Sequence, residues 1–327
     1  MAPGPSKSNA ENLGPRGQVT KSATEGTFLS SCASGLYNLG QAILDEKRYA
    51  EAKLALMPSF FPNLVALDIG NTSADFHWYS DWIAGEHPRP CAAHQVATKS
   101  LLSKQCLSVV FESLFDSDPP PRMTWLAASV HRAAEAQFAT ALRAFRPTDD
   151  YQELHNSDLP LTINVEKPNQ VGTDRLVAAL AANQLREANR PAIIVDAGSA
   201  ITVDLLSAEG IFEGGAILPG FHMAATALAD QTDALPLIDV TSISKLPEVV
   251  GKRTEAAVQS GVVLGTVGAV KEIVNRLLVS APRAQVFVTG GNRGELTWLD
   301  FGDWQIVDDL VPLGIVLAAR YLSQSND

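Results

Sequence analysis

The hydrophobic pattern of the chain is clearest where a short apolar run, Leu64 to Leu67, meets the polar turn Asp68-Ile69-Gly70-Asn71-Thr72. A second strand-like run follows from Ser73 to Tyr79. This order predicts a buried strand, a tight turn rich in Gly and Asn, and a returning strand.

The same order of residues recurs one domain length further along the chain. The apolar run Ala192 to Val195 leads into Asp196-Ala197-Gly198-Ser199, and a second strand is expected from Thr202 to Leu206. A repeat at this spacing indicates a duplicated α/β domain. We therefore predict two similar domains, residues 61–185 and 186–327, with a cleft between them.

Other parts of the chain have the periodicity of helices or of buried strands. Helices are predicted over residues 97–116, 131–145, 221–233, 251–279 and 311–322, and buried strands from Trp125 to Val130 and from Val286 to Gly291. Residues 1–60 combine a Gly-, Pro- and Ser-rich segment with a mixed segment that could form short helices. We expect this extension to be largely disordered.

Composition narrows the classes of partner. Hydrophobic residues make up 46% of the 327 residues, which is enough for large buried cores, and the net charge is −11. An acidic surface argues against nucleic acid or an anionic membrane as the main partner. The three cysteines have neither disulfide nor metal spacing, and no apolar stretch has the length of a membrane span. We therefore expect reduced thiols and a cytoplasmic location.

The two Asp-x-Gly turns have the residue types needed to bind phosphate. A glycine in a turn lets backbone N–H groups approach an anion, and Asn71, Thr72 and Ser199 add short polar side chains. Asp68 and Asp196 would repel phosphate directly, so a ligand role for them requires a bridging cation. Each turn alone also fits an ordinary hairpin, and it is the repetition that favours a nucleotide-phosphate cleft.

The segment Gly172-Thr173-Asp174-Arg175 opens a predicted helix between the two turns. In a structural role, Thr173 would cap that helix and Asp174 would favour its amino terminus. In a functional role, Asp174 would accept the proton of an attacking hydroxyl and Arg175 would clamp a substrate carboxylate. Both interpretations stay open at this point.

Three further segments are weaker candidates. Gly290 and Gly291 could let adenine or ribose lie against the backbone, or could simply end a strand. The segment from Gly214 to Gly220 is a glycine-rich strand and turn. Thr254 could cap the helix that follows Gly251, or it could point its hydroxyl at a ligand.

Taken in order, these motifs resemble the type III pantothenate kinases. The resemblance covers residues 64–323 and rests on the Asp-x-Gly-Asn-Thr turn at Asp68, Gly172-x-Asp174-Arg175, Asp196-x-Gly198-Ser199, Gly214-Gly215-x-Ile217-x-Pro219-Gly220, the segment Thr254 to Gly261, Thr289-Gly290-Gly291 and Leu310-x-Pro-Leu-Gly314. It implies an α/β fold of two duplicated actin-like (ribonuclease H-like) domains around an interdomain ATP cleft. It also implies ATP-dependent phosphorylation of pantothenate to 4'-phosphopantothenate, the first step of coenzyme A biosynthesis.

The resemblance further implies a role for each matching residue. Asp174 would be the catalytic base, and Asp196 would hold a monovalent cation, K⁺ or NH₄⁺. The enzyme would be a homodimer whose pantothenate pockets lie near the subunit interface. Pantothenate would be bound by Gly172, Thr173, Asp174, Arg175 and Thr254, and ATP with Mg²⁺ by Asp68, Ile69, Gly70, Asn71, Thr72, Ser73, Ala74, Asp75 and Ser199.

The sequence departs from the family pattern at three places. Ser199 stands where the family usually has Thr, and it keeps the hydroxyl. Val165 stands where Tyr is common, and Lys167-Pro168 replaces Asn-Pro, which affects the affinity for pantothenate more than the type of reaction. Two alternatives remain: another kinase or phosphatase of the same fold, and a catalytically silent regulatory relative. The three intact aspartates argue against the second.

Overall fold

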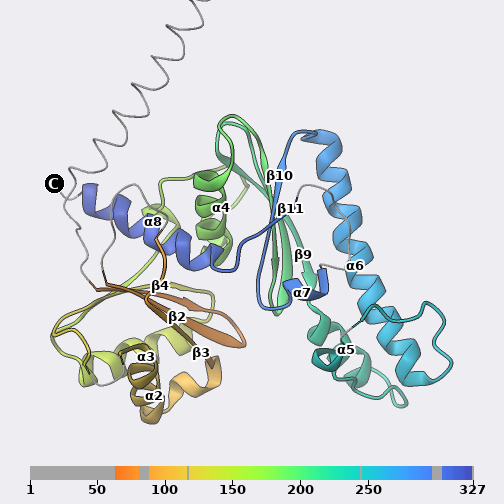
Figure 1. Ribbon diagram of the computed structural model, residues 1–327, viewed down its shortest axis with the longest axis horizontal. Helices are drawn as coiled ribbons and strands as arrows, with labels where there is room; N and C mark the ends of the chain where they lie inside the picture. Colours follow the sequence, from red (N-terminus) through yellow and green to blue (C-terminus); the bar gives the residue numbers. More distant parts are fainter. Residues whose placement is uncertain (1–62, 81–87, 116–117, 244, 297–303, 326–327) are drawn as a thin grey trace, which may run out of the picture. The chain divides into compact units, whose positions relative to one another are not determined.

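The computed structural model describes residues 63–80, 88–115, 118–243, 245–296 and 304–325 (Figure 1). The expected extension, residues 1–60, lies outside these residues. The division of the remainder at residues 185 and 186 stays a prediction. No helix in the described ranges is both long and apolar enough to span a membrane.

The first sheet is built around the strand that carries Asp68. Its order is β3-β2-β1-β4-β5, in which β1, β2 and β3 pair antiparallel and β4 and β5 run parallel to β1. The central strand β1 is almost entirely buried, which explains its unbroken apolar run. The strands are β1 (Leu64–Ile69), β2 (Ser73–Tyr79), β3 (Ala92–Ala97), β4 (Thr124–Ser129) and β5 (Asp150–Glu153).

The second sheet repeats this arrangement strand for strand. Its order is β11-β10-β7-β8-β9-β6, with antiparallel β7, β8 and β9, parallel β10 and β11, and β6 added beside β9. The burial pattern of β7 matches that of β1, and β8 matches β2. The predicted duplicated actin-like fold is therefore confirmed. These strands are β6 (Thr162–Ile163), β7 (Ala192–Ala197), β8 (Ala200–Leu206), β9 (Ile211–Pro219), β10 (Gln285–Thr289) and β11 (Trp304–Ile306).

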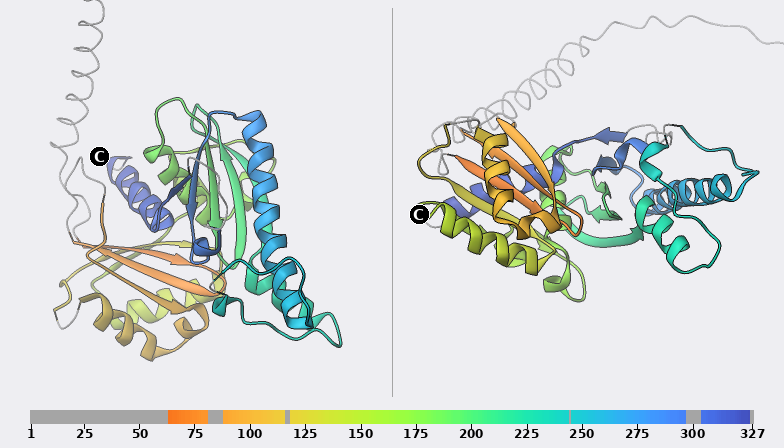
Figure 2. Two further views of the ribbon diagram at one scale, coloured as in Figure 1. Left: turned by 45° about the vertical axis from the view of Figure 1, so that its right-hand side comes forward. Right: turned by 90° about the horizontal axis from the view of Figure 1, so that it is seen from below.

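Helices cover the faces of both sheets (Figures 1 and 2). One core joins α2 and α3 to the outer face of the first sheet, and another joins the second sheet to α5 and α6. A third core holds α4 and α8 together with residues of both sheets. The helices are α2 (Lys104–Phe115), α3 (Arg132–Phe145), α4 (Thr173–Leu185), α5 (Phe221–Asp230), α6 (Thr254–Ser280), α7 (Arg293–Leu296) and α8 (Leu310–Ser325).

The helices α4 and α8 pack unusually closely. A Cβ atom added at Gly314 of α8 would lie 1.9 Å from the carbonyl oxygen of Val177 in α4, so only glycine fits there. On the α4 side, Ala178, Ala181 and Ala182 are buried and small. The glycine that ends the Leu310-x-Pro-Leu-Gly314 motif therefore has a packing role.

The boundaries of several elements differ from the prediction. The strands β3, β5, β6 and β11 were not predicted, because none of their residues is buried and they therefore lack the apolar run of a central strand. The predicted helix over 97–116 begins too early: Ala97 ends β3, Thr98–Leu102 is a 3₁₀ turn, and α2 starts at Lys104. Thr173 and Thr254 do not cap their helices. They are the first residues of α4 and α6, and the N-cap residues are Gly172 and Arg253.

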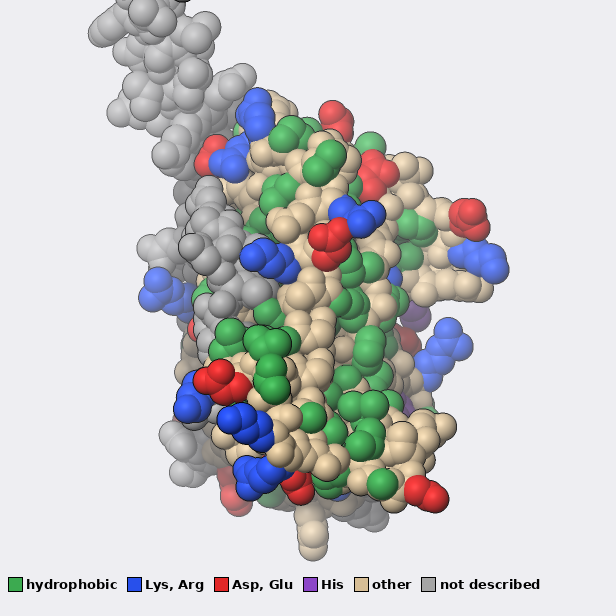
Figure 3. All heavy atoms as spheres, turned by 90° about the vertical axis from the view of Figure 1, so that its right-hand side faces the viewer, with side chains coloured by type: hydrophobic (Ala, Val, Ile, Leu, Met, Phe, Trp, Pro, Cys, Tyr) green, Lys and Arg blue, Asp and Glu red, His purple; other side chains and the backbone are tan. Residues whose placement is uncertain are grey.

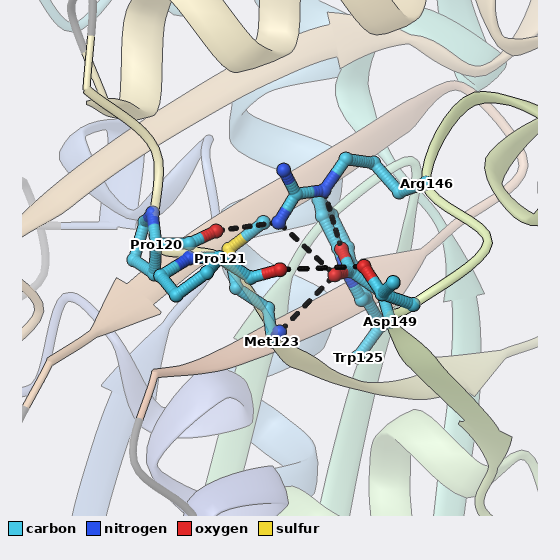
Figure 4. Close-up of polar contacts among 7 residues, drawn as sticks. Pro120, Pro121, Met123, Trp125, Arg146 and Asp149 are labelled. Carbon is cyan, nitrogen blue, oxygen red and sulfur yellow. Dashed lines mark hydrogen bonds and ion pairs between the residues drawn. The ribbon is translucent and has the colours of Figure 1, made fainter.

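A buried ion pair fixes the end of α3 to the sheet (Figure 4). The side chain of Asp149 is 1% exposed, and Arg146 donates to both of its oxygens, at 3.1 and 3.2 Å. The same carboxylate accepts from Nε1 of Trp125 at 3.0 Å and from the backbone N–H of Met123 at 3.2 Å. Arg146 also donates to the carbonyl of Pro120. One carboxylate thus satisfies donors from three residues, two of them in or next to β4 and one at the end of α3.

We expect Asp149→Ala to lower the free energy of unfolding on the order of 3–5 kcal/mol, because it strands a partly buried guanidinium and two buried N–H donors. Urea unfolding measures this loss. The control is Arg122→Ala, whose ion pair with Asp150 is largely exposed and is worth about 1 kcal/mol or less. Equal losses in the two variants would contradict a special role for the buried pair.

Candidate active site

The two Asp-x-Gly turns meet at one cleft of about 700 Å³. The hydroxyl of Thr72 in the first turn contacts the hydroxyl of Ser199 in the second. The structure thus brings together residues that are one domain length apart in the sequence. The predicted site residues that line this cleft are Asp68, Gly70, Asn71, Thr72, Ser73, Asp75, Asp174, Asp196 and Ser199.

Two hydrogen bonds from Thr98, which is 2% exposed, support the first turn. The Thr98 hydroxyl donates to the carbonyl of Gly70 at 2.8 Å, and its backbone N–H donates to the carbonyl of Thr72 at 2.9 Å. Within the turn, the Gly70 N–H donates to the carbonyl of Ser73 at 2.9 Å. These bonds fix the backbone without using the side chains of Asn71 or Thr72.

Asn292 supports the second turn in a similar way. Its backbone N–H donates to the carbonyl of Ala197 at 2.9 Å, and its side-chain amide donates to the carbonyl of Gly198 at 3.0 Å. The adjacent Gly290 has a φ of +93°, and a Cβ there would lie 2.5 Å from Oδ1 of Asp196. Gly290 therefore lets the end of β10 approach Asp196, which is a structural reason for the glycine.

Three carboxylates share the floor of the cleft. Burial raises the pKa of Asp68 well above its usual range, and the charges of Asp174, Asp75 and Asp196 raise it further. Burial, together with Asp174, Asp204 and Asp75, raises the pKa of Asp196 to about 7. Burial also raises the pKa of Asp174, although the backbone N–H and the charge of Arg175 act in the opposite direction. Bringing these groups together as anions is therefore costly unless a cation is present.

The polar groups of the cleft are suited to a cation that is shared with a ligand. The buried Oδ1 of Asp68 has no hydrogen-bond partner. Among the described residues, however, no group of three or more acidic, histidine or cysteine side chains is placed to hold a metal ion. The carboxylates can therefore bind a cation only when other oxygens complete its coordination, as phosphate and water do for Mg²⁺.

Arg175 is bound by a residue that the sequence motifs did not single out. Its Nε donates to Oδ2 of Asp204 at 3.0 Å and its Nη2 contacts Oδ1 of the same carboxylate. Asp204 lies in β8 with a side chain 1% exposed, and the guanidinium stacks on Phe212 at 5.6 Å. The signal that could have identified Asp204 in the sequence is its charge, because it stands inside the otherwise uncharged strand Ala200–Leu206. This side-on pair occupies one edge of the Arg175 guanidinium and fixes its orientation.

A second cavity, of about 680 Å³, lies beside the first. Gly172 and Thr173 line it, and Val130 lines both cavities. The turn that precedes Asp174 therefore separates two spaces, with the Asp174 side chain on the cleft that holds the hairpin turns.

Some predicted site residues lie elsewhere. The side chains of Ile69 and Ala74 are fully buried in the core with α2 and α3, so only their backbone can reach a ligand. Thr254 is exposed at the start of α6 and lines neither cavity.

The cleft also contains residues that the motifs did not indicate. His77 is buried, and its Nδ1 lies 3.9 Å from Oδ1 of Asp309 without a hydrogen-bond partner. Gln95 donates to Asp75 at 2.7 Å from the neighbouring strand β3. The half-exposed pattern of β3 gave no signal that could have placed Gln95 here.

Comparisons with known proteins point to the same family that the sequence motifs resemble. The family model described as type III pantothenate kinase matches residues 64–276. A type III pantothenate kinase of Thermus thermophilus is 35% identical over 230 residues, which cover 70% of this chain and 87% of the relative. One from Dinoroseobacter shibae is 31% identical over 79% of this chain and 98% of the relative. One from Rhodopirellula baltica is 42% identical over 170 residues, and the match spans 60% of that relative's length.

The raised pKa of Asp196 predicts a pH dependence of stability. Its pKa is 3.8 in the unfolded reference and about 7 in the fold, so the folded chain binds the proton more tightly. The free energy of unfolding should therefore fall as the pH rises from about 4 to about 7. With chelator and without nucleotide, we expect Asp196→Asn to be more stable than wild type above pH 7 and to converge with it near pH 4.

Urea unfolding at a series of pH values measures this difference. Glu112→Gln, which removes an exposed carboxylate of α2, should leave the pH dependence of wild type unchanged. A pH dependence of Asp196→Asn that is identical to wild type would show that Asp196 is not the group responsible.

Proposed function

The chain is a phosphotransferase that belongs to the type III pantothenate kinase family, whose members phosphorylate pantothenate with ATP, and we propose how its residues divide this reaction. The observation that carries the proposal is the convergence of Asp68, Asp174 and Asp196 on one cleft. This cleft lies between two hairpin turns whose backbones are held by hydrogen bonds from Thr98 and Asn292. ATP would supply the phosphoryl group, and pantothenate would be the acceptor at the first step of coenzyme A biosynthesis. The cytoplasm is the proposed compartment.

We assign the triphosphate of ATP to the space between the two turns. The hydroxyls of Thr72 and Ser199 and the backbone of the two turns line this space, and the Ser73 hydroxyl, which now donates to Asp75 at 3.2 Å, would turn to the phosphate. Because Thr72 and Ser199 contact each other directly, a phosphate that binds to both must part them. Asn71 and Asp75 complete the proposed ATP site on the first turn.

Two cations are part of the proposal. Mg²⁺ bound to ATP would be held near Asp68, whose buried Oδ1 has no hydrogen-bond partner. A monovalent cation, K⁺ or NH₄⁺, would be held at Asp196. When bound, these ions neutralise charge on the phosphates and on the carboxylates, which is the main catalytic requirement of phosphoryl transfer.

Asp174 is the proposed general base. It stands at the start of α4, at the wall between the phosphate cleft and the second cavity, where an acceptor hydroxyl can approach from outside the ATP site. Burial raises its pKa, which makes the carboxylate a better proton acceptor. Domain closure around the two substrates would exclude water from this point.

The proposed pantothenate site uses Gly172, Thr173 and Arg175. Asp204 takes the edge of the guanidinium formed by Nε and Nη2. An arginine has five N–H donors, so Nη1 would be left for the substrate carboxylate. Arg175 lines neither cavity and its side chain is 14% exposed, so the substrate would have to reach it through the wall formed by Gly172 and Thr173. Asp204 would fix the direction of Nη1 while reducing the net charge that attracts the substrate. Val165, which packs near Gly214, stands where the family commonly has Tyr and would weaken binding of pantothenate.

We expect Asp174→Asn to lower kcat roughly 10²–10⁴-fold, because the amide cannot accept the hydroxyl proton. Coupled ADP release with pantothenate, with and without K⁺, measures the rate, and nucleotide binding measures whether the cleft is intact. The control is Asp118→Asn, which changes an exposed aspartate remote from the cleft.

The assay distinguishes failure of the proposed activity from failure of the proposed role of Asp174. Absence of ADP release with pantothenate in the wild type would point to another acceptor or to a silent relative. A normal rate in Asp174→Asn would leave the activity in place and remove Asp174 from the role of base.

A homodimer would explain the position of Thr254, which lies outside the cleft of its own chain. Along α6, Gly261, Gly265 and Gly268 are exposed at helical spacing, and nothing lies within 4 Å of a Cβ placed at any of them. Such a stripe of small residues permits close contact with another helix. Val249 and Val250 beside it are 78% and 74% exposed, and hydrophobic side chains gather on this face (Figure 3). A second copy of this chain would cover this surface and bring its Thr254 to the partner's pantothenate site.

Mixing two impaired variants tests this arrangement. Asp174→Asn and Thr254→Ala should each have low activity alone, but a mixed dimer would keep one site with both groups intact. After the subunits exchange, we expect about a quarter of wild-type activity, since half the dimers are mixed and each has one intact site. Activity that stays at the average of the two separate variants would show that Thr254 does not act across an interface.

A further inference from the structure

The segment Pro168–Thr173 precedes Asp174 and must hold this residue in the cleft against electrostatic repulsion. Asp174 must lie near Asp68 and Asp196, and the three charges repel one another. The start of α4 has no ordinary anchor, because its N-cap is Gly172 and no side chain caps it. A helix that begins in this way lacks the hydrogen bond that usually fixes its first turn.

Asn156 supplies the missing anchor from another part of the chain. Its side-chain amide donates to the carbonyl of Pro168 at 2.8 Å and to the carbonyl of Val171 at 2.9 Å. Its Oδ1 accepts from the hydroxyl of Thr173 at 3.1 Å. Both amide hydrogens and the amide oxygen are thus used, and all three bonds end on the six residues that precede Asp174, 168–173.

The anchor is itself held rigidly. Asn156 begins the 3₁₀ turn η2 (Asn156–Asp158), and the N–H of His155 donates to the carboxylate of Asp158 at 2.8 Å. The N–H of Asp158 returns to the carbonyl of His155 at 2.9 Å. This reciprocal pair closes the turn and fixes the backbone from which the Asn156 side chain extends.

We propose that Asn156 is a positioning residue for the catalytic base: it holds the turn Pro168–Thr173 so that Asp174 stays in the phosphate cleft. The chemistry requires asparagine, since only a side-chain amide offers two donors and an acceptor at this length. An aspartate of the same shape would place an anion against two carbonyl oxygens and add a further negative charge near the cleft. The proposal rests on the assignment of Asp174 as base.

Kinetics and hydrogen exchange on the full chain test the proposal. We expect Asn156→Asp and Asn156→Ala to lower kcat by roughly 10- to 100-fold, because small misplacements of a reacting group cost this much. The KM for ATP should stay within about twofold of wild type, since the ATP turns are held by Thr98 and Asn292 instead. Thr173→Val removes one of the three bonds and should give a smaller loss in the same direction.

Amide hydrogen exchange of residues 166–176 gives a readout that needs no substrate. It should be faster in Asn156→Ala than in wild type, while exchange in β1 and β7 stays unchanged. The control is Asn164→Ala. Asn164 is exposed and directly follows β6, and its side chain donates to Glu213 and not to the turn Pro168–Thr173. This variant should match wild type in kcat and in exchange.

The outcomes are distinguishable from those of the proposed function. If the wild type fails to phosphorylate pantothenate, the proposed function fails, while faster exchange in Asn156→Ala would still support the anchor. Unchanged exchange at residues 166–176 would overturn the anchor. A kcat within about twofold of wild type in Asn156→Asp, or a KM for ATP that rises in step with the loss of kcat, would overturn the positioning role.

Discussion

Asp68, Asp174 and Asp196 bring three carboxylates into one buried cleft, and their mutual repulsion is the constraint on which the rest of the site depends. Burial alone would raise their pKa values, and their proximity raises two of them further. The nearby counter-charges are already paired: Arg293, which lines the cleft, with Asp308, and Arg175, next to Asp174, with Asp204. The fold must therefore hold the carboxylates in place by rigid backbone. It leaves their neutralisation to the cations and phosphates for which the site is proposed.

Duplication of the domain provides that rigidity twice. Asp68 and Asp196 occupy the same position in equivalent strands, β1 and β7, and each strand ends in a turn held by bonds from a neighbouring segment. Asp174 is different, because it comes from the start of a helix and no equivalent strand supports it. Its support comes from a separate loop, through Asn156. The site thus combines the ends of two equivalent strands with the start of one helix.

The sequence allowed the central strands and both Asp-x-Gly turns to be predicted, because central strands are buried on both faces and therefore appear as apolar runs. It also indicated the helix that begins at Thr173. Edge strands such as β3 and β5 could not be predicted, since half of their residues face solvent and their pairing depends on distant partners. Asn156 was missed for a related reason, because its contacts run across at least 12 positions and leave no local pattern. Asp204 left a local signal, a charge in an apolar strand, but its partner Arg175 lies 29 positions away.

The close packing of Gly314 on Val177 has a consequence for the synthesis of the chain. The helix that carries Asp174 is rich in alanine and is covered on one side by α8, which leaves the ribosome more than a hundred residues later. Until then, the side of α4 that α8 covers has no partner, and the cleft cannot take its final form. The first domain is therefore translated well before it can be completed. A nascent chain must keep this apolar helix from aggregation while the second domain is being made.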